Sequence, residues 1–405
     1  MTYPRKTLLI ITQVYPPDPA AVGQHIADVA KKMAARGWRV IVYTASRGYD
    51  DPSICFPAYE TADGVQIRRL PFSSFGKTSI AIRLLAQALF MSQAFLRSLC
   101  IAGLTRILVS TSPPFAGFGG ALLSYLRRTP LVWWLMDLNP DQLIASGRIS
   151  ASSLIARSFD WMNRFTLRQA WSVIVLDRFM KDRILTKAPF AFKTHIIPPW
   201  AHNDVLEDVP HAANPFRAAH GLDDRFVVMY AGNHGYATPV EAMLGAARML
   251  AHNPRIVFAF VGGGVLKPVI DDYVSREKPT NVLSLPYQPL ADIRFSLSAA
   301  DVHLVSLAPE SVGIVHPCKV YGALAIGRPV IAMAPLDSYL ADIVRSHDVG
   351  WLCTEPTAAA LADLVGRADA CGPLERARLS ASAKQLATAS YRSDRLSDAV
   401  CDLLA

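Results

Sequence analysis

One lysine and its flanking prolines and glycine form the part of this chain whose residue types and spacing can do chemistry. Pro317 is typical of the first position of a helix, Gly327 is typical of the position just past its end, and Pro329 leads into an apolar strand. A helix start leaves backbone N–H groups free and carries the positive end of the helix dipole. Lys319 adds an ammonium group two residues further on. The pattern predicts a binding site for an anion such as a nucleotide diphosphate. The alternative is that Lys319 is a solvated helix lysine.

Glycines follow two of the predicted strands at the places where phosphates bind in open α/β sheets. Gly23 comes after the first apolar run, and the sequence Gly232-Asn233-His234-Gly235 follows a later one. Because glycine lets a backbone approach a phosphate closely, we expect both loops to contact the ligand. Asn233 or His234 can add a side-chain hydrogen bond. For Gly23 the alternative is a plain strand–helix turn.

Two carboxylates follow the apolar run 131–135. Asp137 and Asp141 are therefore expected at the carboxyl end of a strand, where a carboxylate can orient or deprotonate an acceptor hydroxyl. A helix cap, with Pro140 in the first turn, is the alternative for Asp137. The six cysteines contain no Cys-x-x-Cys pair and lie near no histidine cluster. We therefore expect neither a metal site nor a disulfide framework, and a reducing compartment.

The elements that must position these residues repeat one pattern twice. Short apolar runs alternate with helical stretches, which predicts parallel sheets covered on both faces. The fold class is therefore α/β, with two Rossmann-like domains facing a cleft. A proline-rich stretch, 196–215, is the expected linker and hinge. The predicted strands are 8–12, 40–43, 106–110, 131–135 and 173–176 in the first half, and 226–232, 256–261, 282–285, 302–305 and 329–333 in the second.

Charge is unevenly divided between the two halves. Residues 1–200 hold 24 Lys and Arg against 11 Asp and Glu, whereas residues 201–405 hold 17 against 22. This bias indicates that the first half faces an anionic partner, for which membrane phospholipid, a lipid diphosphate and nucleic acid are candidates, and ordinary surface scatter is the alternative. No known nucleic-acid-binding module is recognisable, so we expect no nucleic acid. The apolar start of the chain is too short for a signal peptide, which predicts a cytoplasmic protein.

The segment 78–103 is the most apolar helical stretch. Arg83 and Arg97 bracket too few uncharged residues for a membrane span. An amphipathic helix in the headgroup plane is one interpretation, with Lys77 and Arg106 also at its margins. A domain helix packed on the sheet is the other, and both stay open.

Several short motifs occur in an order that resembles one enzyme family. The motifs are Tyr15-Pro16-Pro17-Asp18 with Gly23, Arg36-Gly37-Trp38, the stretch 134–141, Pro198-Pro199-Trp200, the stretch 230–235, Leu285-Pro286-Tyr287-Gln288 and the stretch 317–331. In this order they resemble the motifs of GT-B glycosyltransferases of family 4. Within that family the pattern is similar to the bacterial exopolysaccharide branch of the colanic-acid type.

The resemblance implies an organisation of the chain and a function. Residues 1–200 would form an acceptor-binding domain, residues 201–385 a nucleotide-sugar-binding domain, and residues 386–405 a helix crossing back to the first domain. The implied enzyme is a retaining hexosyl-type transferase that needs no metal or cofactor. Its donor would be a nucleotide sugar, UDP-linked, and its acceptor a glycan or lipid-linked precursor. Together with the basic first half, this predicts a peripheral position at the inner face of the bacterial cytoplasmic membrane.

The resemblance also implies donor contacts. Tyr287 and Gln288 would bind the base, while the loop containing Gly313 and His316 would hold the sugar and phosphates. The chain departs from the family at the Glu-x7-Glu acids, which are replaced by Ile314 and Gly322. Glu310 is our candidate to replace the first.

Two other functions stay open at this stage. Loss of both glutamates favours a catalytically weak binding or scaffold subunit of the same fold. A nucleotide-sugar epimerase of GT-B shape is the other alternative, and it would need further carboxylates. Neither half carries the dinucleotide-binding pattern of an oxidoreductase.

Overall fold

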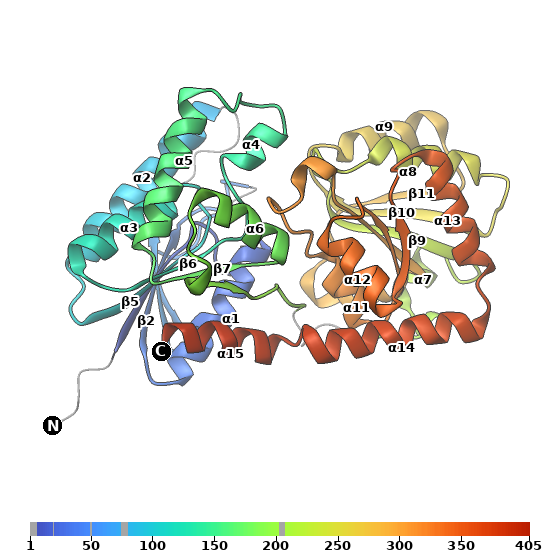
Figure 1. The fold of residues 1–405 in the computed structure, drawn as a ribbon. Helices are drawn as coiled ribbons and strands as arrows, with labels where there is room; N and C mark the ends of the chain where they lie inside the picture. Colours follow the sequence, from blue (N-terminus) through green and yellow to red (C-terminus); the bar gives the residue numbers. More distant parts are fainter. Residues whose placement is uncertain (1–5, 19, 49–50, 74–79, 202–206) are drawn as a thin grey trace. The chain divides into compact units, whose positions relative to one another are not determined.

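The computed structural model describes residues 6–18, 20–48, 51–73, 80–201 and 207–405, and Lys77 lies outside them. Contacts divide the chain into two compact units (Figure 1). Unit 1 comprises Met1–Pro198, Gly313–Val315 and Asp394–Ala405, and unit 2 comprises Pro199–Val312 and His316–Ser393. Each unit is an α/β structure built on its own sheet, which confirms the predicted two-domain fold class.

The sheet of unit 1 has the strand order β3-β4-β2-β1-β5-β6-β7-β8. All neighbouring strands are parallel except the hairpin pair β3 and β4. Strands β1, β6 and β7 are wholly buried, as expected for apolar runs covered by helices on both faces. The strands are β1 (Thr7–Ile11), β2 (Arg39–Ala45), β3 (Tyr59–Ala62), β4 (Val65–Leu70), β5 (Leu104–Val109), β6 (Leu131–Trp134), β7 (Ser172–Val175) and β8 (Thr194–Ile196).

Three helices of unit 1 form one layer. Helices α2 and α5 both pack against α3, and the three lie side by side (Figure 1). The helices of unit 1 are α1 (Ala21–Ala35), α2 (Ile80–Leu99), α3 (Ala116–Arg127), α4 (Asp141–Ala145), α5 (Leu154–Gln169), α6 (Arg178–Lys187) and α15 (Ser393–Leu404).

The sheet of unit 2 is entirely parallel, with the order β11-β10-β9-β12-β13-β14. Its strands are β9 (Phe226–Asn233), β10 (Ile256–Gly263), β11 (Val282–Leu285), β12 (Val302–Ser306), β13 (Val330–Met333) and β14 (Gly350–Cys353). Its helices are α7 (Pro215–Ala219), α8 (Val240–Met249), α9 (Lys267–Glu277), α10 (Ile293–Ser298), α11 (Lys319–Ala325), α12 (Tyr339–His347), α13 (Ala358–Ala370) and α14 (Pro373–Ser390).

Every strand that the apolar runs predict is present, but four strands were missed. Arginines interrupt β4, and Arg69 is buried because Glu60 of β3 pairs with it at 2.7 Å. Strand β14 begins at Gly350, whose φ of +146° places its backbone against Val330. Tertiary contacts, rather than apolar periodicity, stabilise these strands, so the sequence pattern did not show them.

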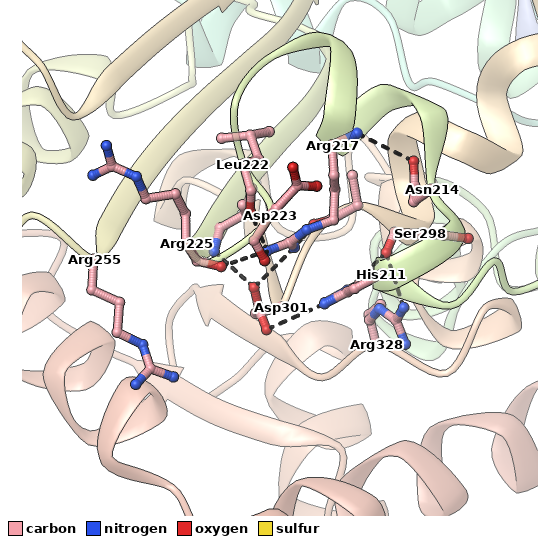
Figure 2. Close-up of polar contacts among 12 residues, drawn as sticks. His211, Asn214, Arg217, Leu222, Asp223, Arg225, Arg255, Ser298, Asp301 and Arg328 are labelled. Carbon is pink, nitrogen blue, oxygen red and sulfur yellow. Dashed lines mark hydrogen bonds and ion pairs between the residues drawn. The ribbon is translucent and has the colours of Figure 1, made fainter.

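A buried arginine fixes the start of unit 2. Arg217 of α7 donates to the carbonyl oxygens of Leu222 and Ala299, both at 2.6 Å, and to the carboxylate of Asp301 at 3.3 Å (Figure 2). A fully buried guanidinium needs such partners, because each unpaired polar group in the interior is costly. The predicted linker 196–215 is therefore partly structured: β8 ends in it, and α7 begins at its last residue.

The chain ends in two helices that are interrupted at Tyr391. Helix α14 belongs to unit 2, whereas α15 belongs to unit 1. In unit 1, Arg36 at the end of α1 pairs with Asp398 at 2.9 Å and Asp402 at 2.7 Å of α15. Leu396, Val400 and Leu404 of α15 are buried. The last helix thus returns to the first unit, which confirms that part of the fold class.

Candidate nucleotide-sugar site

Lys319 is the cation that unit 2 places at the carboxyl end of β9. Its Nζ donates to the backbone oxygen of Asn233 at 2.7 Å and to the phenol oxygen of Tyr230 at 2.6 Å. The ammonium also lies 3.8 Å from the centroid of the Tyr230 ring. Among the described residues, no carboxylate pairs with Lys319. Its ammonium therefore has no counter-ion among the described side chains, which suits binding of an anion.

The Lys319–Tyr230 pair perturbs both groups. Burial lowers the pKa of Lys319, and the neighbouring Tyr230 offsets only part of this effect. Burial by itself would raise the pKa of Tyr230, but the Lys319 charge and hydrogen bonds from Lys319, Thr238 and Ser306 bring it below its usual value. Tyr230 and Thr238 hydroxyl oxygens lie 2.9 Å apart. Sequence reasoning missed Tyr230, because a tyrosine in an apolar strand is typical of core packing.

Glycines at the end of β9 and β10 allow neighbouring segments of unit 2 to pack closely against each other. A Cβ on Gly232, at φ +116°, would lie 2.8 Å from Cε of Lys319, and one on Gly262 would lie 2.1 Å from the oxygen of Gly232. Gly235 has more room, since its nearest contact would be at 3.6 Å. Gly232 is thus needed for Lys319 to cross β9, while contact of either glycine with a phosphate stays a prediction.

His234 is fully buried directly after β9. Its Nδ1 lies 3.2 Å from the oxygen of Gly263, so Nδ1 carries the proton that this hydrogen bond requires. Burial lowers the pKa of His234 to about 4, and the charge of Lys319 adds to that effect. Its Nε2 has no hydrogen-bond partner among the described residues. His234 is therefore a neutral side chain that shapes the loop, and Asn233 is the exposed residue beside it.

The residues predicted to bind the base lie past the end of β11. Tyr287 is 56% exposed, and its ring covers Gly263, where an added Cβ would come within 2.8 Å of it. Gln288 donates from Nε2 to the oxygen of Pro286 at 3.0 Å. The Tyr287 ring is exposed, and its stacking on a base stays a prediction.

The start of α11 differs from the predicted one. The helix begins at Lys319 with Cys318 as its N-cap, so the placement of Pro317 at the first helical position was wrong. Pro317 precedes the helix, and its oxygen accepts a hydrogen bond from Tyr339 at 2.8 Å. His316 is buried between Tyr339 and Tyr321, with ring centroids 3.8 and 5.7 Å away. His316 thus packs between two tyrosines, and its contact with the sugar or phosphates stays a prediction. Helix α11 is short, so it contributes the Lys319 charge rather than a long helix dipole.

The loop before α11 is divided between the units. Glu310 is exposed in a one-turn 3-10 segment, Pro309–Ser311, of unit 2. Gly313, at φ +69°, belongs to unit 1, where an added Cβ would meet the oxygen of Phe179 at 2.6 Å. Ile314 is buried, and its oxygen accepts from the backbone N–H of Leu138 at 2.9 Å. Glu310 and Ile314 therefore belong to different units, and replacement of the lost acid by Glu310 stays a prediction.

Asp137 follows β6 at the carboxyl edge of the unit 1 sheet. Its backbone N–H donates to Oγ1 of Thr111 at 3.2 Å. In the described part of the chain no hydrogen bond or ion pair reaches its carboxylate. Burial raises the pKa of Asp137 to about 6. A carboxylate that titrates near neutrality and is unpaired can accept a proton or a hydrogen bond from a hydroxyl.

Asp141 is not free in the same way. It is the first residue of α4, and its carboxylate pairs with Arg183 at 3.2 Å and Lys187 at 2.9 Å, both from α6. These contacts join α4 to α6. They give Asp141 a structural role, and of the two predicted acids only Asp137 has an available carboxylate.

Gly23 lies inside the first turn of α1 rather than in the preceding loop. An added Cβ would lie 3.0 Å from backbone atoms of Val14 and Tyr15. Gly23 is therefore needed because the backbone of Val14 and Tyr15 passes close to it. Contact of Gly23 with a phosphate stays a prediction.

No group of three or more His, Cys, Asp or Glu that could hold a metal ion is found in ranges 6–18, 20–48, 51–73, 80–201 and 207–405.

Comparison with known proteins agrees with this organisation. A family model described as "Glycosyl transferase 4-like domain" matches residues 20–200, and one described as "Glycosyl transferases group 1" matches residues 213–386. The glycosyltransferase named WbjE of Pseudomonas aeruginosa is 26% identical over 338 residues, covering 81% of this chain and 84% of that protein. The colanic acid biosynthesis glycosyl transferase named WcaI of Escherichia coli K12 is 23% identical over 353 residues, covering 84% and 86%.

Solved structures share the fold over nearly the whole length. Sucrose-phosphate synthase from Thermosynechococcus elongatus superposes with a TM-score of 0.75 at 18% identity, covering 98% of both chains. HepE of Anabaena, solved in complex with UDP-glucose, superposes with a TM-score of 0.70 at 17% identity, covering 98% of this chain and 99% of that one. The two family models match most of the chain in the order of its two units, and the chain therefore belongs to the GT-B glycosyltransferases with a 4-like first domain and a group 1 second domain.

Proposed function

We propose that this glycosyltransferase transfers a sugar from a UDP-sugar to a lipid-linked or polysaccharide precursor, with retention of configuration and without a metal ion. The observation that carries the donor assignment is Lys319, whose ammonium is held at the end of β9 with no carboxylate partner in the described part of the chain. A diphosphate supplies the missing charge. HepE, which shares the fold, was solved with UDP-glucose, and this supports the choice of UDP.

The donor would occupy the carboxyl edge of the unit 2 sheet. Lys319 would contact the diphosphate, Asn233 and Gly235 would border it, and the exposed Tyr287 ring would stack on the base. This is the edge at which ligands bind in open α/β sheets.

The reaction would proceed without an enzyme nucleophile. The bond between the anomeric carbon and the diphosphate oxygen breaks, and its electron pair leaves with the diphosphate. The acceptor oxygen bonds to the same face of the sugar, and its proton passes to the departing phosphate oxygen. Lys319 would stabilise the charge on the diphosphate, and Asp137 would orient the acceptor hydroxyl by accepting its hydrogen bond.

The acceptor and the cellular location rest on unit 1. Its basic charge favours an anionic, lipid-linked acceptor at the inner face of the cytoplasmic membrane. Within the described ranges no helix has the length and apolarity needed to cross a bilayer. Membrane association would therefore be peripheral.

A donor-binding scaffold is the second candidate, because Ile314 and Gly322 stand where the family carries its two glutamates. Ile314 is buried, and a Cβ on Gly322 would contact Leu297 at 3.4 Å. Neither position offers a polar side chain to the donor. An epimerase is less well supported, since Asp141 is already paired with two cations.

Calorimetry tests the proposal with UDP, GDP, dTDP and ADP, each with EDTA and each with added magnesium. We expect UDP to bind selectively and equally in both conditions. A UDP-sugar is then incubated with the protein and a lipid extract, and NMR of the glycosylated product gives its anomeric configuration. Retention of the configuration of the donor would support the proposed reaction. Binding without any turnover identifies a scaffold, and no response to any of the four diphosphates overturns the donor site.

A further inference from the structure

The helix layer of unit 1 exposes large apolar side chains over all three of its helices. Leu85, Leu96, Tyr125, Leu126, Leu154 and Trp161 are each more than half exposed. On α2 the exposed Leu85, Leu89 and Leu96 are spaced by four and seven residues, so they form one stripe along the helix. Ala86, Phe90 and Ala94 on the other side of α2 are buried. Because α2, α3 and α5 lie side by side, the exposed residues are spread over one continuous layer (Figure 1).

Trp161 marks the layer as amphipathic rather than simply apolar. It is 59% exposed, although its ring packs 5.5 Å from Phe118 of α3 and 6.1 Å from Phe165 of α5. Trp and Tyr side chains that are apolar on one side and solvent-exposed on the other are typical of the region between lipid headgroups and acyl chains.

The charge of this layer is of one sign. The only acidic residue of the three helices is Asp160, which is paired with Arg164 at 2.7 Å and Lys187 at 2.9 Å. The described basic side chains of the three helices are those of Arg97, Arg127, Arg157, Arg164 and Arg168. A layer with many arginines and one neutralised acid attracts an anionic surface.

A basic groove lies where the leucine stripe of α2 ends. It has a volume of about 600 Å³ and is lined by Leu96, Arg97 and Cys100 together with Arg39, Tyr43 and Arg68 of the sheet. Arg68 donates to Gln66 at 3.3 Å, and none of the three arginines pairs with a carboxylate of any described residue. Three guanidinium groups around one groove make a site for a phosphate group.

We propose that the α2–α3–α5 layer is the membrane-binding face of this protein and that the arginine groove binds the headgroup phosphate of an anionic phospholipid. The exposed leucines and Trp161 would enter the acyl boundary beside it. This inference rests on the membrane placement in the proposed function and specifies the surface and the lipid group. The occupant is a lipid rather than a soluble phosphate because the groove is continuous with the apolar stripe through Leu96.

Vesicle flotation tests the proposal on the full-length protein. We expect binding to vesicles of phosphatidylcholine mixed with phosphatidylglycerol, and little to phosphatidylcholine alone. The groove variant Arg39→Gln/Arg97→Gln should reduce partition by about fivefold for each arginine removed. The stripe variant Leu85→Ser/Leu96→Ser should reduce it by about tenfold or more, because less apolar surface is buried. Higher salt should weaken wild-type binding.

A matched variant on unit 2, Leu374→Ser/Arg345→Gln, changes an exposed leucine and an exposed arginine and should bind vesicles as the wild type does. Calorimetry with UDP on every variant reports folding and the donor site separately from the lipid result. Equal binding to both vesicle types, or full binding by the groove and stripe variants, would overturn the proposal. Inorganic phosphate bound in the groove without any vesicle binding would also overturn it.

Discussion

The Nζ of Lys319 lies 2.6 Å from the phenol oxygen of Tyr230 and 3.8 Å from the centroid of its ring, so one tyrosine contacts the ammonium in two ways. The hydroxyl accepts a hydrogen bond, while the ring face attracts the cation. Residues 230 and 319 are far apart in sequence and meet because β9 and the start of α11 reach the same end of the sheet. The position of the proposed diphosphate contact therefore depends on Tyr230 as well as on Lys319.

Lys319→Ala should weaken UDP binding by about tenfold to a hundredfold, the range expected for losing a charge-assisted hydrogen bond. Lys319→Arg should recover part of the loss. Calorimetry at constant ionic strength measures both. Lys384→Ala on α14 is the control, since that lysine pairs with Asp208 at 3.4 Å. Unchanged affinity of the alanine variant would place the diphosphate elsewhere.

Tyr230→Phe keeps the ring under the ammonium but removes its hydrogen-bond acceptor. We expect UDP affinity to fall by about threefold to tenfold, with a changed dependence on alkaline pH because the phenol no longer titrates beside Lys319. The matched control is Tyr273→Phe, which alters a buried tyrosine of α9. If Tyr230→Phe binds UDP like the wild type at every pH, the carbonyl of Asn233 positions Lys319 alone.

Asp137→Asn should increase the stability of the protein but decrease its transfer activity. Because burial raises the pKa of Asp137 to about 6, against about 3.9 in an unfolded chain, stability is lost as the pH rises from about 4 through 6. The amide should raise the free energy of unfolding at pH 7 by about 1–2 kcal/mol, measured by urea titration. Transfer activity should fall by about a hundredfold and lose its rise between pH 5 and 7. Full activity in this variant would remove Asp137 from the mechanism.

Acid should destabilise unit 2 through two buried histidines. Burial lowers the pKa of both His303 and His234 to about 4, against about 6.5 in an unfolded chain. Stability is therefore complete above about pH 6.5 and is lost as the pH falls toward 4, by about 2 kcal/mol per histidine at pH 5. Thermal unfolding at pH 7 and pH 5 measures the loss.

His303→Gln should reduce that acid loss, because glutamine can still donate to the oxygen of Leu297, which His303 contacts at 3.0 Å, but does not titrate. The exposed His252→Gln should keep the whole loss. If His303→Gln shows the wild-type difference between the two pH values, protonation of other groups causes the acid sensitivity.

Local pattern was enough to determine the fold class of this protein. Apolar runs such as those at β6 and β9 are readable because a strand buried on both faces must be apolar throughout, whatever it packs against. Short motifs in order were enough to indicate a GT-B glycosyltransferase, because they mark loops between successive elements.

Only the tertiary structure decided which candidate side chains are available. Asp137 and Asp141 look alike in sequence, but α6 brings Arg183 and Lys187 to Asp141 alone. Tyr230 lies in an apolar strand, and only the fold brings Lys319 against it. Likewise, the two interpretations of segment 78–103 differ only in what covers α2, and Leu85 and Leu96 are exposed. Availability depends on neighbours that are distant in sequence, so no local pattern could determine it.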